Sequence, residues 1–121
     1  MIIDPDRIDA EAQGSRPLLL KRIVKAEQHG GKLSLTWVRI WGHHDRVVNQ
    51  ESDRAYYILE GTGRFQAGDE PEARVQAGQV VFIRAGVPYE FEGEMTYLVM
   101  NGPAFVAGSD RVLPGVMGDP A

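Results

Sequence analysis

Short apolar segments separated by glycine and proline are the feature that most constrains the fold of this chain. Valine, isoleucine, tyrosine, phenylalanine and tryptophan recur in these segments, and only 6–13 suggests a short helical turn. Many short strands in one small domain indicate a sandwich or a closed barrel, because closure removes the unpaired edges at which sheets aggregate. The sequence therefore predicts an all-β fold, with strands over 17–24, 32–41, 46–49, 55–60, 63–67, 73–76, 80–83, 89–92 and 95–101.

Turn signals connect several of these strands. The stretch EGTGRF predicts a hairpin, because Gly61 and Gly63 are able to adopt positive φ, and AGDEPE predicts a second turn. Beyond the expected core at 17–103 the chain is rich in glycine, proline and alanine. We expect 104–121 to form an extended tail on the surface.

Length and charge limit the kinds of protein to which this chain belongs. Its 121 residues predict a single domain over 1–121, which is long enough for a buried core. The net charge of −4 without a basic cluster argues against a nucleic-acid partner. No cysteine is present, and no apolar run approaches the roughly 20 residues of a membrane span. With no recognisable leader, we expect a cytoplasmic protein without a membrane partner.

Two stretches resemble the sequence motifs of a known family. GHHDRVVNQESDRAYYILEG and GQVVFIRAGVPYEFEG resemble the two motifs of the cupin superfamily, and the framing glycines are Gly42, Gly61, Gly78 and Gly86. The resemblance spans roughly the middle half of the chain. It implies a cupin-like double-stranded β-helix, or jelly-roll, barrel, in which the family usually carries a metal at the barrel mouth.

The four positions that carry the metal ligands in the family are all substituted here. The resemblance places Val48 and Gln50 at the paired histidines, Arg54 at the glutamate and Tyr89 at the histidine of the second motif. Valine and arginine do not ligate a divalent cation, because the cation needs lone pairs from imidazole or carboxylate groups. We therefore expect no metal and no other cofactor.

Two adjacent histidines offer a weaker route to a metal site. Neighbouring residues of a strand point to opposite faces, so at most one of His43 and His44 would face the barrel interior. We interpret the pair as a polar corner after Trp41. A non-standard metal site formed by one of them with Glu51 is the less favoured alternative.

The candidate catalytic residues are Arg54 and Tyr89. Strand alternation and the resemblance place them in the barrel with Gln50, Tyr56 and Phe91, which we expect to contact the ligand. The guanidinium would stabilise negative charge, and the phenol would exchange a proton with the ligand.

Arg54 also has a purely structural interpretation. A buried guanidinium requires a partner, which is either an anionic ligand or a nearby acid such as Glu51, Asp53 or Glu90. The sequence leaves both interpretations open.

Trp37, Arg39 and Trp41 share one face of a predicted strand. Trp37 and Arg39 are therefore further candidate ligand-binding residues, because an indole and a guanidinium stack on planar ligands. The same stripe suits core packing, which we favour, or a subunit interface. We expect a homodimer to which 18–20 contributes.

The resemblance permits several functions. The first hypothesis is a metal-independent isomerase, epimerase, lyase or cyclase, which moves a proton next to a carbonyl of a small polar, anionic or sugar-like metabolite. The alternative is a non-catalytic small-molecule-binding or sensor module, and a metal-dependent dioxygenase is less favoured. Fold does not decide among them, because cupins host many activities.

Overall fold

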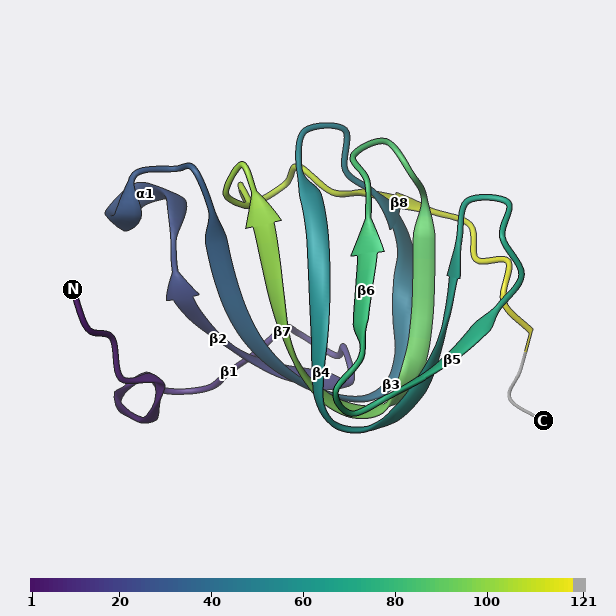
Figure 1. Cartoon of the computed structure of the whole chain (residues 1–121), viewed down its shortest axis with the longest axis horizontal. Helices are drawn as coiled ribbons and strands as arrows, with labels where there is room; N and C mark the ends of the chain where they lie inside the picture. Colours follow the sequence, from purple (N-terminus) through teal and green to yellow (C-terminus); the bar gives the residue numbers. More distant parts are fainter. Residues whose placement is uncertain (119–121) are drawn as a thin grey trace.

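The computed structural model describes residues 1–118, and the all-β prediction is confirmed (Figure 1). Within these residues one sheet has the order β1-β2-β3-β7-β4-β5, with β6 paired to β4 and β8 paired to β3. A 3-10 turn, η1 (Pro5–Arg7), and a short helix, α1 (Ala26–His29), accompany it. The strands are β1 (Glu11–Ala12), β2 (Leu18–Val24), β3 (Ser34–Val48), β4 (Asp53–Ala67), β5 (Ala73–Gln76), β6 (Val80–Ile83), β7 (Tyr89–Gly102) and β8 (Arg111–Leu113).

Three long strands build both halves of the barrel. Figure 1 shows β3, β4 and β7 curving through the base of the molecule, so that their two ends rise on opposite sides. Each was predicted as two short strands. The glycines that suggested turns between them lie inside continuous strands, and the hairpin predicted at EGTGRF is therefore wrong.

A row of glycines crosses the three long strands at the bend. Gly42 of β3 and Gly63 of β4 both pair with Gly93 of β7. A Cβ at Gly63 would lie 2.6 Å from the Glu92 carbonyl oxygen, and one at Gly93 would lie 2.5 Å from the Thr62 carbonyl oxygen. Only glycine allows this close approach, which lets the strands fold over sharply.

The core lies between the two halves. Alternate residues of each strand point inward, as the period of two requires. Ile58 and Phe91 are completely buried, and aromatic rings fill much of the interior. The cluster comprises Leu18, Leu20, Val38, Ile40, Val47, Tyr56, Ile58, Phe65, Val75, Ile83, Tyr89, Phe91, Met95 and Tyr97.

The N-terminal segment differs from its prediction, and the C-terminal tail contains one strand that was not predicted. Residues 6–13 form part of η1 and the strand β1 rather than a helical turn. The predicted tail is extended and mostly exposed over 104–118, whereas 119–121 lie outside the described residues. This tail also contains β8, which pairs with β3. It is therefore tied to the barrel by backbone hydrogen bonds.

Apolar side chains gather on the outer surface of β4, β6 and β7. Tyr57 pairs with Val80, and Ala55 pairs with Phe82 and Met100, so these side chains share one face of the sheet. Phe82 is 59% exposed and Val80 is 58% exposed. We call Tyr57, Val80, Phe82 and Met100 the outer apolar face.

The outer apolar face is exposed and so is available to the expected homodimer, unlike the leucines predicted for its interface. Leu18 and Leu20, which were expected to contribute to an interface, point into the core instead.

No helix among the described residues has the length and apolar character needed to span a membrane.

Candidate functional site

A cavity of about 150 Å³ opens beside the aromatic core. Strands β2, β3, β4 and β7 form its walls, and the segments before β2 and after β7 contribute the rest. Its polar lining includes Arg16, Arg22, His44, Arg54, Asn101 and Asp110, with Tyr56 and Phe105 among the aromatic residues. We call this space the barrel cavity.

Arg54 is paired within the protein. Its side chain lies on the inner face of β4 and is almost completely buried. Nη2 donates to Asp110 Oδ1 at 2.5 Å, and Nη1 donates to Asp110 Oδ2 at 3.1 Å and to the Tyr89 hydroxyl at 2.6 Å. Arg54 therefore has an internal acid partner, but none of the three acids named from the sequence is that partner. Asp110 comes from the tail and offsets the cost of burying the guanidinium.

Two tyrosines extend this network into the core. The Tyr56 and Tyr89 hydroxyls are hydrogen-bonded to each other, and both rings are buried. Burial raises the pKa of both phenols, although the neighbouring Arg54 guanidinium opposes the increase at Tyr89. Both hydroxyls therefore stay protonated, and the predicted grouping of Arg54, Tyr56 and Tyr89 is present.

His44 supplies the cavity with a neutral imidazole. Its ring stacks on Phe91, with the centroids 4.5 Å apart. Nδ1 lies 2.8 Å from the Asp45 carbonyl oxygen and must donate, because a carbonyl only accepts. Burial lowers the His44 pKa to about 4, so Nε2 keeps its lone pair and faces the Arg16 guanidinium at 3.5 Å.

His43 points away from the barrel cavity, as the opposite faces of a strand require. Its Nε2 lies 2.6 Å from Oε2 of Glu90, which is completely buried. Glu90 Oε1 also accepts hydrogen bonds from the backbone amides of Val116 and Met117. Burial raises the pKa of the Glu90 carboxyl, whereas the hydrogen bonds from these amides and from His43 lower it, and the pKa is lowered overall. His43 and Glu90 therefore hold the tail, and the interpretation of both histidines as a polar corner is wrong because they lie within β3.

Three candidate ligand-binding residues lie outside the cavity. Gln50 is exposed, because β3 ends at Val48 and strand alternation no longer applies in the following turn. Trp37 and Arg39 point to the outer side of β3, while the alternate residues Thr36 and Val38 line the cavity. Lys21 Nζ lies 5.5 Å from the centre of the Trp37 ring on that outer side.

Phe91 contacts the site only through its neighbours. It is completely buried and stacks beneath His44 and against Phe65. It therefore supports the His44 ring and does not itself line the cavity.

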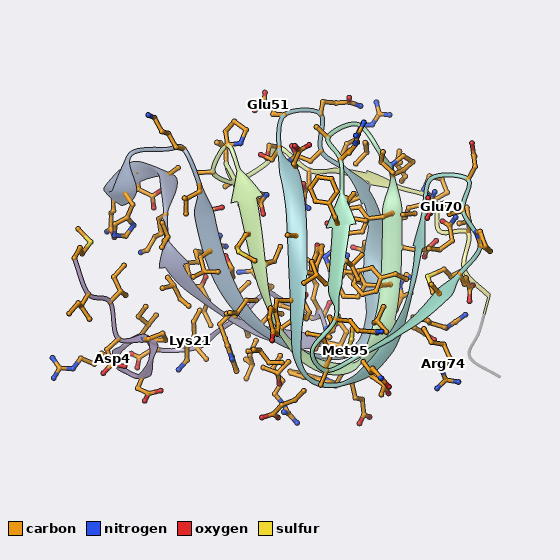
Figure 2. The ribbon with its side chains drawn as sticks, in the orientation of Figure 1. Asp4, Lys21, Glu51, Glu70, Arg74 and Met95 are labelled. Carbon is orange, nitrogen blue, oxygen red and sulfur yellow. The ribbon has the colours of Figure 1, made fainter. Side chains whose placement is uncertain are left out.

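The residues present do not fit the metal that the fold family implies. Arg54 and Tyr89 are hydrogen-bonded to each other at the expected ligand positions, and a guanidinium repels a cation. Residues 1–118 contain no group of three or more histidines, cysteines or acids placed to hold a metal ion. Glu51, the other candidate ligand, is exposed at the upper rim in Figure 2.

Comparison with known proteins supports the fold. The cupin domain family matches residues 43–101. Pac13, described as a unique nucleoside dehydratase, superposes with a TM-score of 0.80 at 15% identity, covering 97% of this chain and 93% of that chain. KdgF from Halomonas sp. superposes with a TM-score of 0.70 at 12% identity, covering 85% of this chain and 93% of that chain.

A larger protein shares the same barrel. Oxalate decarboxylase from Bacillus subtilis superposes with a TM-score of 0.76 at 15% identity, covering 90% of this chain and 31% of that chain. No curated protein sequence matches the chain. The family match over 43–101, the all-β architecture and these structural neighbours agree with the two sequence motifs, and the chain has a cupin-like fold.

Proposed function

We propose that the protein is a metal-independent lyase that removes water from a small polar or anionic metabolite in the barrel cavity. The observation that carries this proposal is the neutral His44, whose Nε2 lone pair faces a cavity that also holds the donors of Arg54 and Tyr56. A base and acidic groups in one cavity suit proton transfer.

His44 acts as the base. Nε2 takes a proton from a carbon next to a carbonyl group, and the electron pair of the broken C–H bond forms the new C=C bond as the C–O bond to the leaving hydroxyl breaks. The Asp45 carbonyl oxygen accepts the hydrogen bond from Nδ1, which fixes the tautomer and stabilises the imidazolium that forms.

Tyr56, Tyr89 and Arg54 act on the leaving hydroxyl group. The phenol pair supplies the proton that converts the leaving hydroxide into water, and the Tyr89 hydroxyl already accepts a hydrogen bond from Arg54 Nη1. The guanidinium lowers the cost of negative charge on that phenol oxygen. The proton held by His44 returns to the phenol through solvent, which completes the cycle.

The structural neighbours favour a lyase over the other three reaction types. Pac13 is described as a nucleoside dehydratase, and Streptomyces PAC13 structures with uridine include variants in which a histidine is replaced by glutamine or a tyrosine by phenylalanine. The same residue types, His44, Tyr56 and Tyr89, meet in this chain. At these identities the likeness establishes the fold alone, so it supports the proposal without identifying a substrate.

A non-catalytic binding module is the second candidate. The bidentate pairing of Arg54 with Asp110 favours it, because a neutralised guanidinium stabilises developing negative charge less strongly. Ligand binding without turnover would identify such a module.

The test is solvent-isotope exchange followed by NMR. The protein is incubated in D₂O with small sugars and 3-hydroxy acids, and both deuterium incorporation and loss of water are recorded. His44→Gln should lower the rate by about 10²–10⁴, the usual contribution of a general base. His29→Gln is the matched control, because the His29 ring accepts a hydrogen bond from the Lys25 backbone amide outside the cavity and the variant should retain the rate.

Two results would contradict the proposal. Turnover that survives His44→Gln would remove the proposed base. A compound that protects the protein against thermal unfolding but shows neither exchange nor dehydration would favour the binding module instead.

A further inference from the structure

The barrel cavity carries more positive than negative charge, although the whole chain has a net charge of −4. Three arginines line it, and Asp110 is the acid among its lining residues. Two of the arginines are balanced by acids. Arg54 pairs with Asp110, and Arg22 Nε lies 2.9 Å from Glu11 Oε1.

Arg16 is the arginine that lacks a balancing acid. It forms no ion pair with any residue of 1–118. Its Nη2 instead lies 3.5 Å from His44 Nε2, and that imidazole is neutral. Arg16 is exposed to solvent, so its positive charge lies beside the proposed base, is accessible to a dissolved anion and has no acidic partner among residues 1–118.

The inner wall of the same cavity is also short of acceptors. Arg54 Nε and Asn101 Nδ2 are buried donors without a hydrogen-bond partner among the described residues. Arg54 and Asn101 are direct partners across β4 and β7, so both side chains belong to one patch of the wall. Buried donors are rarely left unpaired, and a cavity with excess donors favours a ligand rich in oxygen atoms.

We infer that Arg16 binds an oxyanion of the ligand, either a carboxylate or a phosphate, and thereby places the ligand against His44. The forked guanidinium suits two oxygens of one anion. Arg54 was the expected anion-binding residue, and its pairing with Asp110 transfers that role to Arg16. The placement against His44 rests on the proposed function, whereas the binding of the anion does not.

The experiment uses small probes and the His44 ring signals. Lactate, inorganic phosphate and lactamide are titrated separately into the protein at low ionic strength, and the His44 imidazole resonances are followed by NMR. These resonances are assigned from their loss in His44→Gln. Lactate and lactamide have the same size and differ in charge, while phosphate separates the two anion classes.

The expected result is a saturable shift with lactate or phosphate and a far weaker one with lactamide. Arg16→Gln should raise the dissociation constant of the bound anion about tenfold or more, because it removes a charged hydrogen bond. Arg74→Gln is the control with the same charge change. Arg74 lies in β5 outside the cavity, and this variant should bind as the wild type does (Figure 2).

Three results would overturn the inference that Arg16 binds an anion. No saturable response to either anion, equal responses to lactate and lactamide, or unchanged affinity in Arg16→Gln would show that Arg16 does not select an anion. Anion binding that depends on Arg16 without any isotope exchange would leave this inference standing and contradict the proposed lyase.

Discussion

Acidification should destabilise the fold through His44. The pKa of His44 is about 4 in the folded protein, against an ordinary value of 6.5, because burial penalises the charged ring. Arg16 and Arg54 also lower this pKa, while the Asp45 hydrogen bond and the Asp110 carboxylate act in the opposite direction. Between these two pKa values the unfolded chain binds a proton that the folded protein does not. The free energy of unfolding must therefore fall as the pH decreases through this window.

The size of this effect follows from the two pKa values. Each pKa unit corresponds to about 1.4 kcal/mol, so the complete effect is about 3 kcal/mol, and roughly 2.5 kcal/mol of it is lost by about pH 4.5. For a domain of this length that loss lowers Tm by about 10 °C. Above about pH 7 the contribution of His44 is constant.

Thermal and urea unfolding across this pH range measure the effect. His44→Gln lacks the titrating ring, so the difference in unfolding free energy between wild type and variant should change by roughly 2.5 kcal/mol from about pH 7.5 to about pH 4.5. His29→Gln should retain the wild-type pH dependence of His44. A parallel pH dependence in wild type and His44→Gln would refute the reasoning, because it would mean that His44 titrates alike in the folded and unfolded states.

Asp110→Asn should lower the free energy of unfolding by about 2 kcal/mol, because the substitution leaves the Arg54 guanidinium without a counter-charge. The loss is smaller than for a fully buried pair, because the Asp110 side chain is 24% exposed. Urea unfolding measures this loss, and an effect no larger than that of Asp69→Asn, in the exposed turn after β4, would contradict it. We propose that the outer apolar face is the homodimer interface, so Phe82→Asp should halve the mass found by light scattering; a monomeric wild type at micromolar concentration would disprove the dimer. Glu90→Gln should speed hydrogen exchange of the tail amides it binds, because an amide oxygen accepts more weakly than a carboxylate, and unchanged protection would show that Glu90 does not hold the tail. Elemental analysis should find no stoichiometric transition metal, and one Zn, Fe, Mn or Ni retained per chain after dialysis would argue against the metal-independent site.

The strands were predictable wherever local sequence determines them. β5 and β6 agree with their predicted limits, because turn residues bound both segments. The three long strands were each divided in two, since glycines such as Gly63 and Gly93 indicate turns when read along one chain. Their actual role appears only when the strands lie side by side, where paired glycines permit close contact.

The site residues could be predicted from the sequence only where they lie on strands. Arg54, Tyr56 and Tyr89 follow from strand alternation and the family motifs, and they meet as expected. Asp110 and Arg16 lie in irregular segments, where no periodicity indicates which way a side chain points. The buried guanidinium showed that an acid was needed, but the identity of that acid depends on the path of the tail.

The barrel cavity is lined both by strands of the hydrophobic core and by the C-terminal tail. Its strand-borne wall shares residues such as Tyr56 with the hydrophobic core, so a substitution there alters ligand contact and folding together. Phe105 and Asp110 instead come from a tail that, over 104–118, contributes only Ala104 to the buried apolar residues. Variation in the tail would therefore let ligand preference drift during evolution, or be redesigned in a library, without repacking the aromatic interior. The limit on that freedom is one carboxylate, which must remain opposite Arg54.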